Sequence, residues 1–280
     1  MQRPFATPPR NVPITLRIAN LYNLITLIGF AVLGFGMIFV FTFVANADLS
    51  FITLRGELAR AKGRITRVEK TNASENKTPV IASHYEYSVA GKPFQGVAYA
   101  SGESRTIGET VDVEFKPTDP NVSRIPGMRR AMFSPFVVFV AIFPLIGLAI
   151  VFGGIGRGRK RNHLLQYGLV SNGTLKDKYP TNVRINNAPV WAVVFEFAAR
   201  DGRRYEATAR TTNTARLEDE RQEPLLYDPD DPETAYLLDE APARPQVDNR
   251  GEFIGRPSAY LRLILPVIVF TAIAAAVMLT

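Results

Sequence analysis

The residue types that most often perform catalysis are scarce in this chain and are not grouped. It has no Cys and only two His, His84 and His163, so thiolate nucleophiles and Cys-ligated metals are excluded. A nucleophilic Ser or Thr needs an adjacent, oriented base, and a His-based triad has few ways to form here. His84 and Glu86 share one face of a predicted strand and could supply two metal ligands, but a third is missing. We therefore predict no catalytic residue, no metal site and no cofactor.

Acidic residues are concentrated between positions 218 and 240. They form two groups: Glu218-Asp219-Glu220, and Asp228 with Asp230 and Asp231. The second group could attract Ca²⁺, but it lacks the bidentate Glu of an EF-hand loop, and its prolines are typical of a turn. We interpret the whole acidic segment as a solvated rim.

Three apolar segments dominate the rest of the sequence, at residues 21–47, 131–155 and 259–279. None contains Asp, Glu or Lys, and each exceeds the about 20 residues that a helix needs to cross a bilayer core of about 30 Å. The first ends in Ala45-Asn46-Ala47, a small-residue cleavage pattern. Its apolar run is longer than the roughly 7 to 15 residues of a secretory signal, which favours an uncleaved anchor. The second leads into the glycine-rich residues 153–158, which we interpret as a flexible exit from the membrane because they lack phosphate-loop context.

The net charge of +7 comes largely from clusters beside the apolar segments and is not spread as a nucleic-acid-binding face would spread it. After the second segment come Arg157, Arg159, Lys160 and Arg161, and before the first come Arg3, Arg10 and Arg17. The positive-inside rule places such clusters in the cytoplasm, where they also contact anionic lipids. Residues 1–20 are therefore predicted to be a cytoplasmic tail, disordered over 1–13. Arg129 and Arg130 weaken this topology, and its inverse stays open.

Two soluble segments, residues 63–126 and 169–238, repeat one pattern. The first contains Gly63, Tyr85, Tyr87, Phe115 and Pro117. The second contains Gly173, Phe195, Phe197, Tyr227 and Pro229. With the turn landmarks Gly91-x-x-Phe94 and Gly202-x-x-Tyr205 included, the intervals between consecutive landmarks differ by at most one residue. This repetition predicts one small β module used twice.

Each module is predicted to form four to six short antiparallel strands, as a curled sheet or a small barrel. The alternation is clearest at residues 63–69, 80–89, 94–101 and 110–115, and at 190–198 and 203–210. Asp201-Gly202 predicts a type I′ turn, which needs positive φ. Residues 49–62 are expected to continue the first helix, and residues 241–258 to be a linker to the third apolar segment. The fold class is thus a membrane protein with three transmembrane helices and duplicated β modules.

These landmarks resemble the uncharacterised bacterial membrane family catalogued as domain of unknown function 3592. The resemblance is carried by a Gly before a variable loop, an aromatic-x-aromatic strand, a Gly-containing turn followed by an aromatic, and a closing aromatic-x-Pro-x-x-Pro turn. It covers roughly residues 20–240 and implies a membrane-anchored β domain, with no catalytic residue to carry over. Tyr227-Asp228-Pro229 departs from it by opening an unusually acidic second copy.

The sequence therefore predicts a non-enzymatic interaction or scaffolding protein of the bacterial inner membrane. Its expected partners are the lipid bilayer and another membrane protein or complex, and not nucleic acid. The first module is expected outside and the second in the cytoplasm. The alternative is a small-ligand sensor or transport accessory subunit that binds its ligand in the first module. A concave apolar pocket there would favour the alternative, and a flat sheet with an exposed edge would favour scaffolding.

Overall fold

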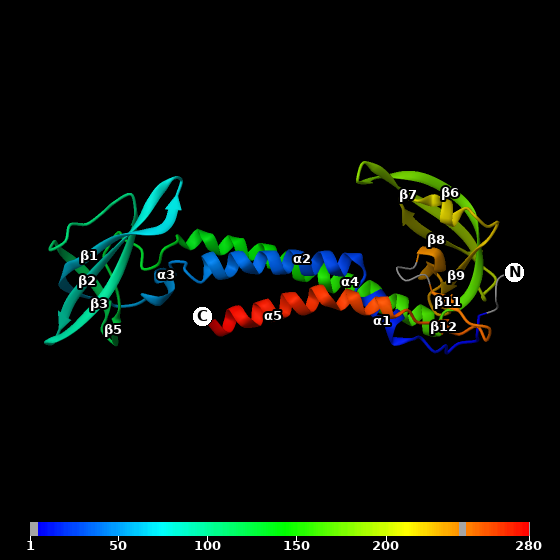
Figure 1. Cartoon of the computed structure of the whole chain (residues 1–280), viewed down its shortest axis with the longest axis horizontal. Helices are drawn as coiled ribbons and strands as arrows, with labels where there is room; N and C mark the ends of the chain where they lie inside the picture. Colours follow the sequence, from blue (N-terminus) through cyan, green and yellow to red (C-terminus); the bar gives the residue numbers. More distant parts are fainter. Residues whose placement is uncertain (1–4, 241–244, 280) are drawn as a thin grey trace. The chain divides into compact units, whose positions relative to one another are not determined.

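The computed structural model describes residues 5–240 and 245–279 (Figure 1). The chain divides into two compact units, one made of the residues up to Gly34 with those from Leu145 onward, and the other of Phe35–Pro144. Each unit contains one antiparallel five-stranded sheet. The duplication predicted from the sequence is therefore also a division between units.

Within the described residues, three helices are long and apolar enough to cross a membrane, at Leu24–Val44, Pro135–Tyr167 and Pro257–Met278. The first is α2 (Leu24–Phe39) extended by a π-helical turn, Val40–Val44. The other two begin as 3₁₀ turns at Pro135 and Pro257 and continue as α4 (Ile142–Tyr167) and α5 (Ile264–Leu279). Proline suits a first turn, because the N–H that it lacks would have no helical partner there. The three predicted apolar helices are confirmed.

Helix α4 continues without a break through residues 153–158, so the predicted flexible exit is wrong. The glycines there allow close helix packing. A Cβ atom on Gly154 would lie 2.8 Å from the backbone nitrogen of Thr26, and one on Gly158 would lie 2.7 Å from the Cα atom of Leu21. Small residues let apolar helices approach to backbone contact, and this packing offsets the poor helix propensity of glycine.

The described part of the N-terminal segment is packed, which corrects the predicted disordered tail. Residues 5–13 lead into helix α1 (Ile14–Leu21). Arg10 is buried and donates hydrogen bonds to the carbonyl oxygens of Leu165 (3.3 Å) and Gly168 (2.8 Å). The last carbonyls of a helix have no partner within it, so a buried guanidinium at the end of α4 satisfies them.

The first β module consists of β1 (Ala59–Glu75), β2 (Thr78–Val89), β3 (Lys92–Ser101), β4 (Thr110–Lys116) and β5 (Asp119–Arg124). Their order in the sheet is β3-β2-β1-β4-β5. Both central residues of the turns Asn76-Lys77 and Ala90-Gly91 have positive φ, as two-residue type I′ hairpins require. The predicted helical continuation over residues 49–62 is wrong beyond the short α3 (Ser50–Thr53), because β1 already begins at Ala59.

The second module consists of β6 (Leu169–Ile185), β7 (Ala188–Ala198), β8 (Arg204–Thr211), β9 (Glu223–Tyr227) and β10 (Ala235–Leu237). Their order, β8-β7-β6-β9-β10, matches the first module. Strand β6 curls strongly, and β8 and β10 approach each other (Figure 1). Of the central residues at the β7–β8 turn only Gly202 has positive φ. The backbone N–H of Ala199 donates a hydrogen bond to the carbonyl oxygen of Arg203, which closes a three-residue loop. The predicted type I′ turn is wrong there, because a longer loop takes a type I turn closed by a glycine bulge.

The two modules also share one register. Ile65 pairs with Tyr85 as Leu175 pairs with Phe195, and β1 and β6 have a β-bulge directly after these positions. Gly63 and Gly173 lie on these central strands, and Cβ atoms added there would lie 3.0 Å from the backbone carbonyl oxygen of Glu86 and 2.9 Å from the Cβ of Phe195. The glycines are therefore needed where the aromatic strand passes closest.

The segment that was expected to be a linker is, where it is described, packed within the unit that holds the second module. Residues 241–244 lie outside the described residues. Strands β11 (Gln246–Val247) and β12 (Phe253–Ile254) pair with each other, and Phe253 is buried against Tyr236 and Leu238. An apolar side chain there covers a face of the second module that would otherwise meet water.

Candidate functional site

At Glu223 the second module has a charged residue where the first has an apolar one. Glu223 begins β9 and pairs with Gly173 on the central strand β6. In the first module Val111 pairs with Gly63 in the same way. Val111 is 5% exposed and Glu223 only 1%, so a carboxyl group stands where the copy has an aliphatic core side chain. Burying a carboxylate without compensation costs several kcal/mol, so this position needs a physical reason.

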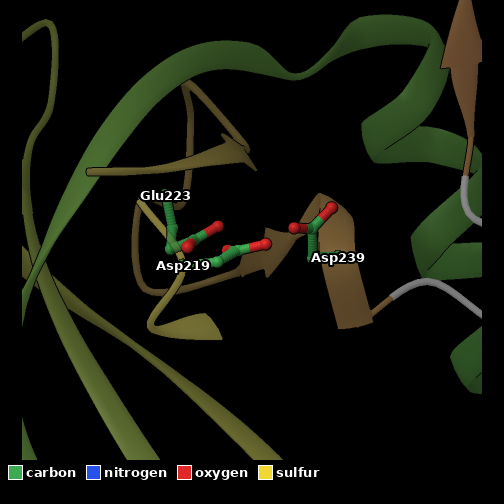
Figure 2. A group of neighbouring side chains, drawn as sticks. All are labelled: Asp219, Glu223 and Asp239. Atoms are coloured by element: carbon green, nitrogen blue, oxygen red, sulfur yellow. The ribbon is translucent and has the colours of Figure 1, made fainter. Parts of the chain in front are cut away.

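Two further carboxylates come close to Glu223. Asp219 belongs to the loop after the 3₁₀ turn Thr214–Leu217, and Asp239 to the 3₁₀ turn Leu238–Glu240 that follows β10. One carboxylate oxygen from each of the three residues lies within 4.8 Å of the other two. Figure 2 shows the three carboxylates turned toward one another. Asp219 and Asp239 are exposed, so water reaches the group from their side while Glu223 closes it on the inside.

Burial is the largest cause that raises the pKa of Glu223, and the negative charges of Asp239, Asp219 and Glu220 add to it, bringing the pKa to about 7. A hydrogen bond to Asp219 favours the protonated form further. The Oε1 atom of Glu223 is itself buried and has no hydrogen-bond partner among the described residues. The group therefore holds either a shared proton or another positive charge.

The sequence missed this site because Glu223 stands among many acidic neighbours. The signal was the alternation of β9, which places Glu223 on the same face as the buried Leu225 and Tyr227. The acidic residues that had been considered for Ca²⁺ form a turn instead. Asp228 accepts a hydrogen bond from the backbone of Asp230, and Asp231 accepts one from Thr234.

In the first module, His84 pairs with Glu69 and not with Glu86. The His84 Nε2 atom lies 3.0 Å from Glu69 Oε1 and 2.9 Å from Arg67 Nη2, so it either donates to the carboxylate or accepts from the guanidinium. The hydrogen bond from His84 lowers the pKa of Glu69. Glu86 accepts from Gln95 instead, at 2.8 Å. Arg67, His84, Glu86 and Gln95 line an open hollow of about 410 Å³. Its lining is mainly polar, unlike the apolar pocket that the sensor alternative requires.

The predicted basic cluster lies on the C-terminal half of α4, where Arg157, Arg159 and Lys160 are exposed. Arg161 differs, because its guanidinium lies 4.8 Å from the centre of the Tyr236 ring and 3.8 Å from Glu240. It therefore joins the helix to the second module. His163, on the same stretch, lies 3.5 Å from Asp228.

The aromatic landmarks Tyr85, Tyr87, Phe115, Phe195, Phe197 and Tyr227 are all buried in the two cores. Pro117 and Pro229 stand in the turns that follow β4 and β9. Gly96 leaves room for the Tyr85 ring, whose hydroxyl bonds to Ser123 at 2.9 Å, whereas the second module pairs Phe195 with Ala207. The landmark residues therefore form the cores and turns of the modules, and they do not contribute to the carboxylate group of the second module.

No family model, curated protein or solved structure matches this chain. The resemblance to the domain of unknown function 3592 thus stays a prediction.

Proposed function

We propose that the chain is an integral membrane protein that displays one β module on each side of a bilayer and works by contacts, without catalysis of its own. The observation that carries the proposal is the repetition of one filled β module in the sequence, once before and once after a single apolar helix. Strand order and register are the same in both copies, and each core is filled by its own aromatic side chains. A duplicated, filled sheet on a membrane anchor suits recognition of another membrane protein.

The number of spans supports the placement of the modules. A single apolar helix, Pro135–Tyr167, connects them, so insertion of that helix puts them on opposite sides. The exposed Arg157, Arg159 and Lys160 favour the cytoplasm for the second module, as does Arg17 for the N-terminus. The opposing signal from Arg129 is reduced by its ion pair with Glu75 at 2.5 Å. The inner membrane of a bacterium is the location that fits best.

Accessible single cysteines test the topology, because the natural chain has none. Ser74→Cys in β1 and Thr212→Cys after β8 are at exposed positions in the two modules. In intact cells an impermeant thiol reagent should label Ser74→Cys and spare Thr212→Cys, while both should react after the membrane is permeabilised. Equal labelling of the two variants in intact cells contradicts the proposal.

Exposed charged residues on β8 and on the neighbouring strands form the contact surface that we propose, and they can be altered without unfolding the module. Arg204 pairs with Glu196 at 2.7 Å, and Lys176 pairs with Glu206 at 2.5 Å. Surface ion pairs contribute only about 0–1 kcal/mol, so reversing their charge changes recognition far more than stability. We expect Arg203→Glu with Arg204→Glu to reduce recovery of co-purifying membrane proteins in mild detergent. The double variant His84→Ala, His163→Ala should leave cellular function intact; its loss in folded protein would contradict the contact function and favour an enzyme, or the sensor if His84→Ala alone causes the loss.

A second candidate, a sensor of a small polar ligand, is favoured by the hollow beside His84 and Arg67. Its test is the pair Arg67→Ala and His84→Ala. Loss of a cellular response with normal insertion and normal partner recovery would support the sensor over the scaffold.

A further inference from the structure

We propose that Asp219, Glu223 and Asp239 form a divalent-cation site in the second module, and that Ca²⁺ is the ion that fits it best. The proposal goes beyond the contact function and does not rest on it. Three carboxylates from three separate segments converge on one point, and carboxylate oxygens are the ligands that hard divalent cations prefer.

The distances suit Ca²⁺. Its oxygen ligands lie about 2.3–2.6 Å from the ion, so oxygens on opposite sides of it are roughly 4.6–5.2 Å apart. The three carboxylate oxygens here lie within 4.8 Å of one another and therefore fit inside one such shell without a change of fold. Mg²⁺ requires near-octahedral ligands at about 2.0–2.1 Å and gives up its water reluctantly, so we expect weaker binding of Mg²⁺.

The burial of Glu223 is a second, independent observation that points to a ligand. Acidic groups at a surface are common, but Glu223 is 1% exposed and its Oε1 atom is buried without a hydrogen-bond partner among the described residues. A buried acceptor of this kind is costly unless a donor or a cation completes it. Asp219 and Asp239 face water, which can supply the remaining ligands of a six- to eight-coordinate ion.

The repeat supplies an internal reference for this argument. The equivalent position in the first module is Val111, so the β fold itself needs only an aliphatic side chain there. The carboxyl group in the second copy is therefore not required for folding. A bound ion would join the loop before β9, the start of β9 and the 3₁₀ turn after β10, and it should stabilise the second module.

The single tryptophan of the chain allows the second module to be followed alone. Trp191 lies on β7 and packs against the core of this module. We would heat the full-length protein in detergent micelles at pH 8 after EDTA treatment, with and without millimolar CaCl₂, MgCl₂ or MnCl₂. CaCl₂ should raise the midpoint of the Trp191 fluorescence transition by about 5 °C or more, as an ion that binds only the folded module does.

Two variants decide between a specific site and a general charge effect. Glu223→Val copies the first module and should remove the response to CaCl₂, whereas Glu233→Gln, at an exposed acidic residue outside the group, should keep it. If Glu223→Val fails to fold, Asp219→Asn with Asp239→Asn at the exposed positions should weaken Ca²⁺ binding in calorimetry at least tenfold. A wild-type midpoint that none of the three cations moves overturns the proposal, as does a carboxylate variant that responds like the wild type. The readout does not depend on topology or partners, so it fails independently of the contact function.

Discussion

The outer faces of the two β modules differ where β4 meets β5 and where β9 meets β10. In the first module Glu114 pairs across the strands with Arg124, which it holds at 2.9 Å, and also contacts Arg60 at 3.2 Å. The equivalent pair in the second module is Leu226 and Tyr236. These two side chains are buried in a second apolar cluster with Val12, Leu16, Leu164, Leu165, Leu238 and Phe253. The face of the first module is a buried carboxylate paired with two arginines that reach water, and the face of the second module is an apolar core.

The comparison indicates that the inner core of the module defines the fold, while the residues of the outer face determine which segments pack against it. The apolar outer face of the second module holds the N-terminal segment, the end of α4 and the β11–β12 hairpin. At this place on the first module two arginines that reach water cover the buried carboxylate of Glu114. An apolar pair where the first module has an ion pair thus allows this face of the second module to be buried.

Placing a charge in the second apolar cluster should have the largest effect. Leu226→Glu copies the residue of the first module into a buried site without its arginine partners, so we expect a loss of about 4 kcal/mol or more in the unfolding free energy of the second module. Denaturation followed by Trp191 fluorescence measures it. The reciprocal Glu114→Leu in the first module should cost less, about 1.5–3 kcal/mol, because Arg60 and Arg124 lose their hydrogen bonds to a charged group but can turn toward water; hydrogen exchange measures it. Equal losses would show that the two faces are not different in kind.

The shared inner core predicts matched losses in the two modules. Phe115 and Tyr227 pair with Ala59 and Leu169 at equivalent places and are both buried. Truncation of either to Ala should cost roughly 3–5 kcal/mol in its own module. Limited proteolysis can separate the two modules, because each variant should become sensitive only in the copy that carries it. Loss of both modules from one substitution would contradict their independence.

The buried carboxyl group gives the second module a pH dependence that the first should lack. In the absence of divalent cations the folded pKa of Glu223 is about 7, above its ordinary value of 4.5. The raised value means that ionisation opposes folding, so stability is highest below about pH 4.5 and falls as pH rises through 7, by up to ~3 kcal/mol. Trp191 fluorescence in EDTA between pH 5 and pH 8 should show this decline in the wild type and a flatter profile in Glu223→Val. A decline of the same size in the variant would assign the effect to other groups.

The smallest expected effect concerns a hydrogen bond from a threonine side chain to a backbone carbonyl, which both modules have. Thr71 donates to the carbonyl oxygen of Val80 at 2.9 Å, and Thr181 donates to that of Val190 at 2.8 Å, each beside a register shift. Replacing either Thr by Val should cost about 1 kcal/mol, the usual contribution of such a bond. Thermal unfolding of the two variants should show similar small losses, and a large difference between them would mean that the register is held differently in the two copies.

Local sequence patterns were enough to predict many of the strands, the apolar helices and the repeated module. Alternation predicted the strands at residues 80–89, 94–101 and 110–115, composition predicted the three apolar helices, and the spaced landmarks predicted a module used twice. These features follow from the sequence because strand alternation, helix hydrophobicity and turn residues act over a few neighbouring positions.

Only the tertiary structure decided which polar residues leave water. Arg10 is buried where it donates to carbonyl oxygens at and just after the end of α4, and the helix around residues 153–158 is packed through Gly154 and Gly158 against the residues of α1 and α2. Glu223 is buried by its pairing with β6, and Asp239 reaches it from the turn after β10. Along the chain these carboxylates are only part of an acidic run. Their environment depends on contacts between residues far apart in sequence, and such contacts have no local period for a sequence pattern to reveal.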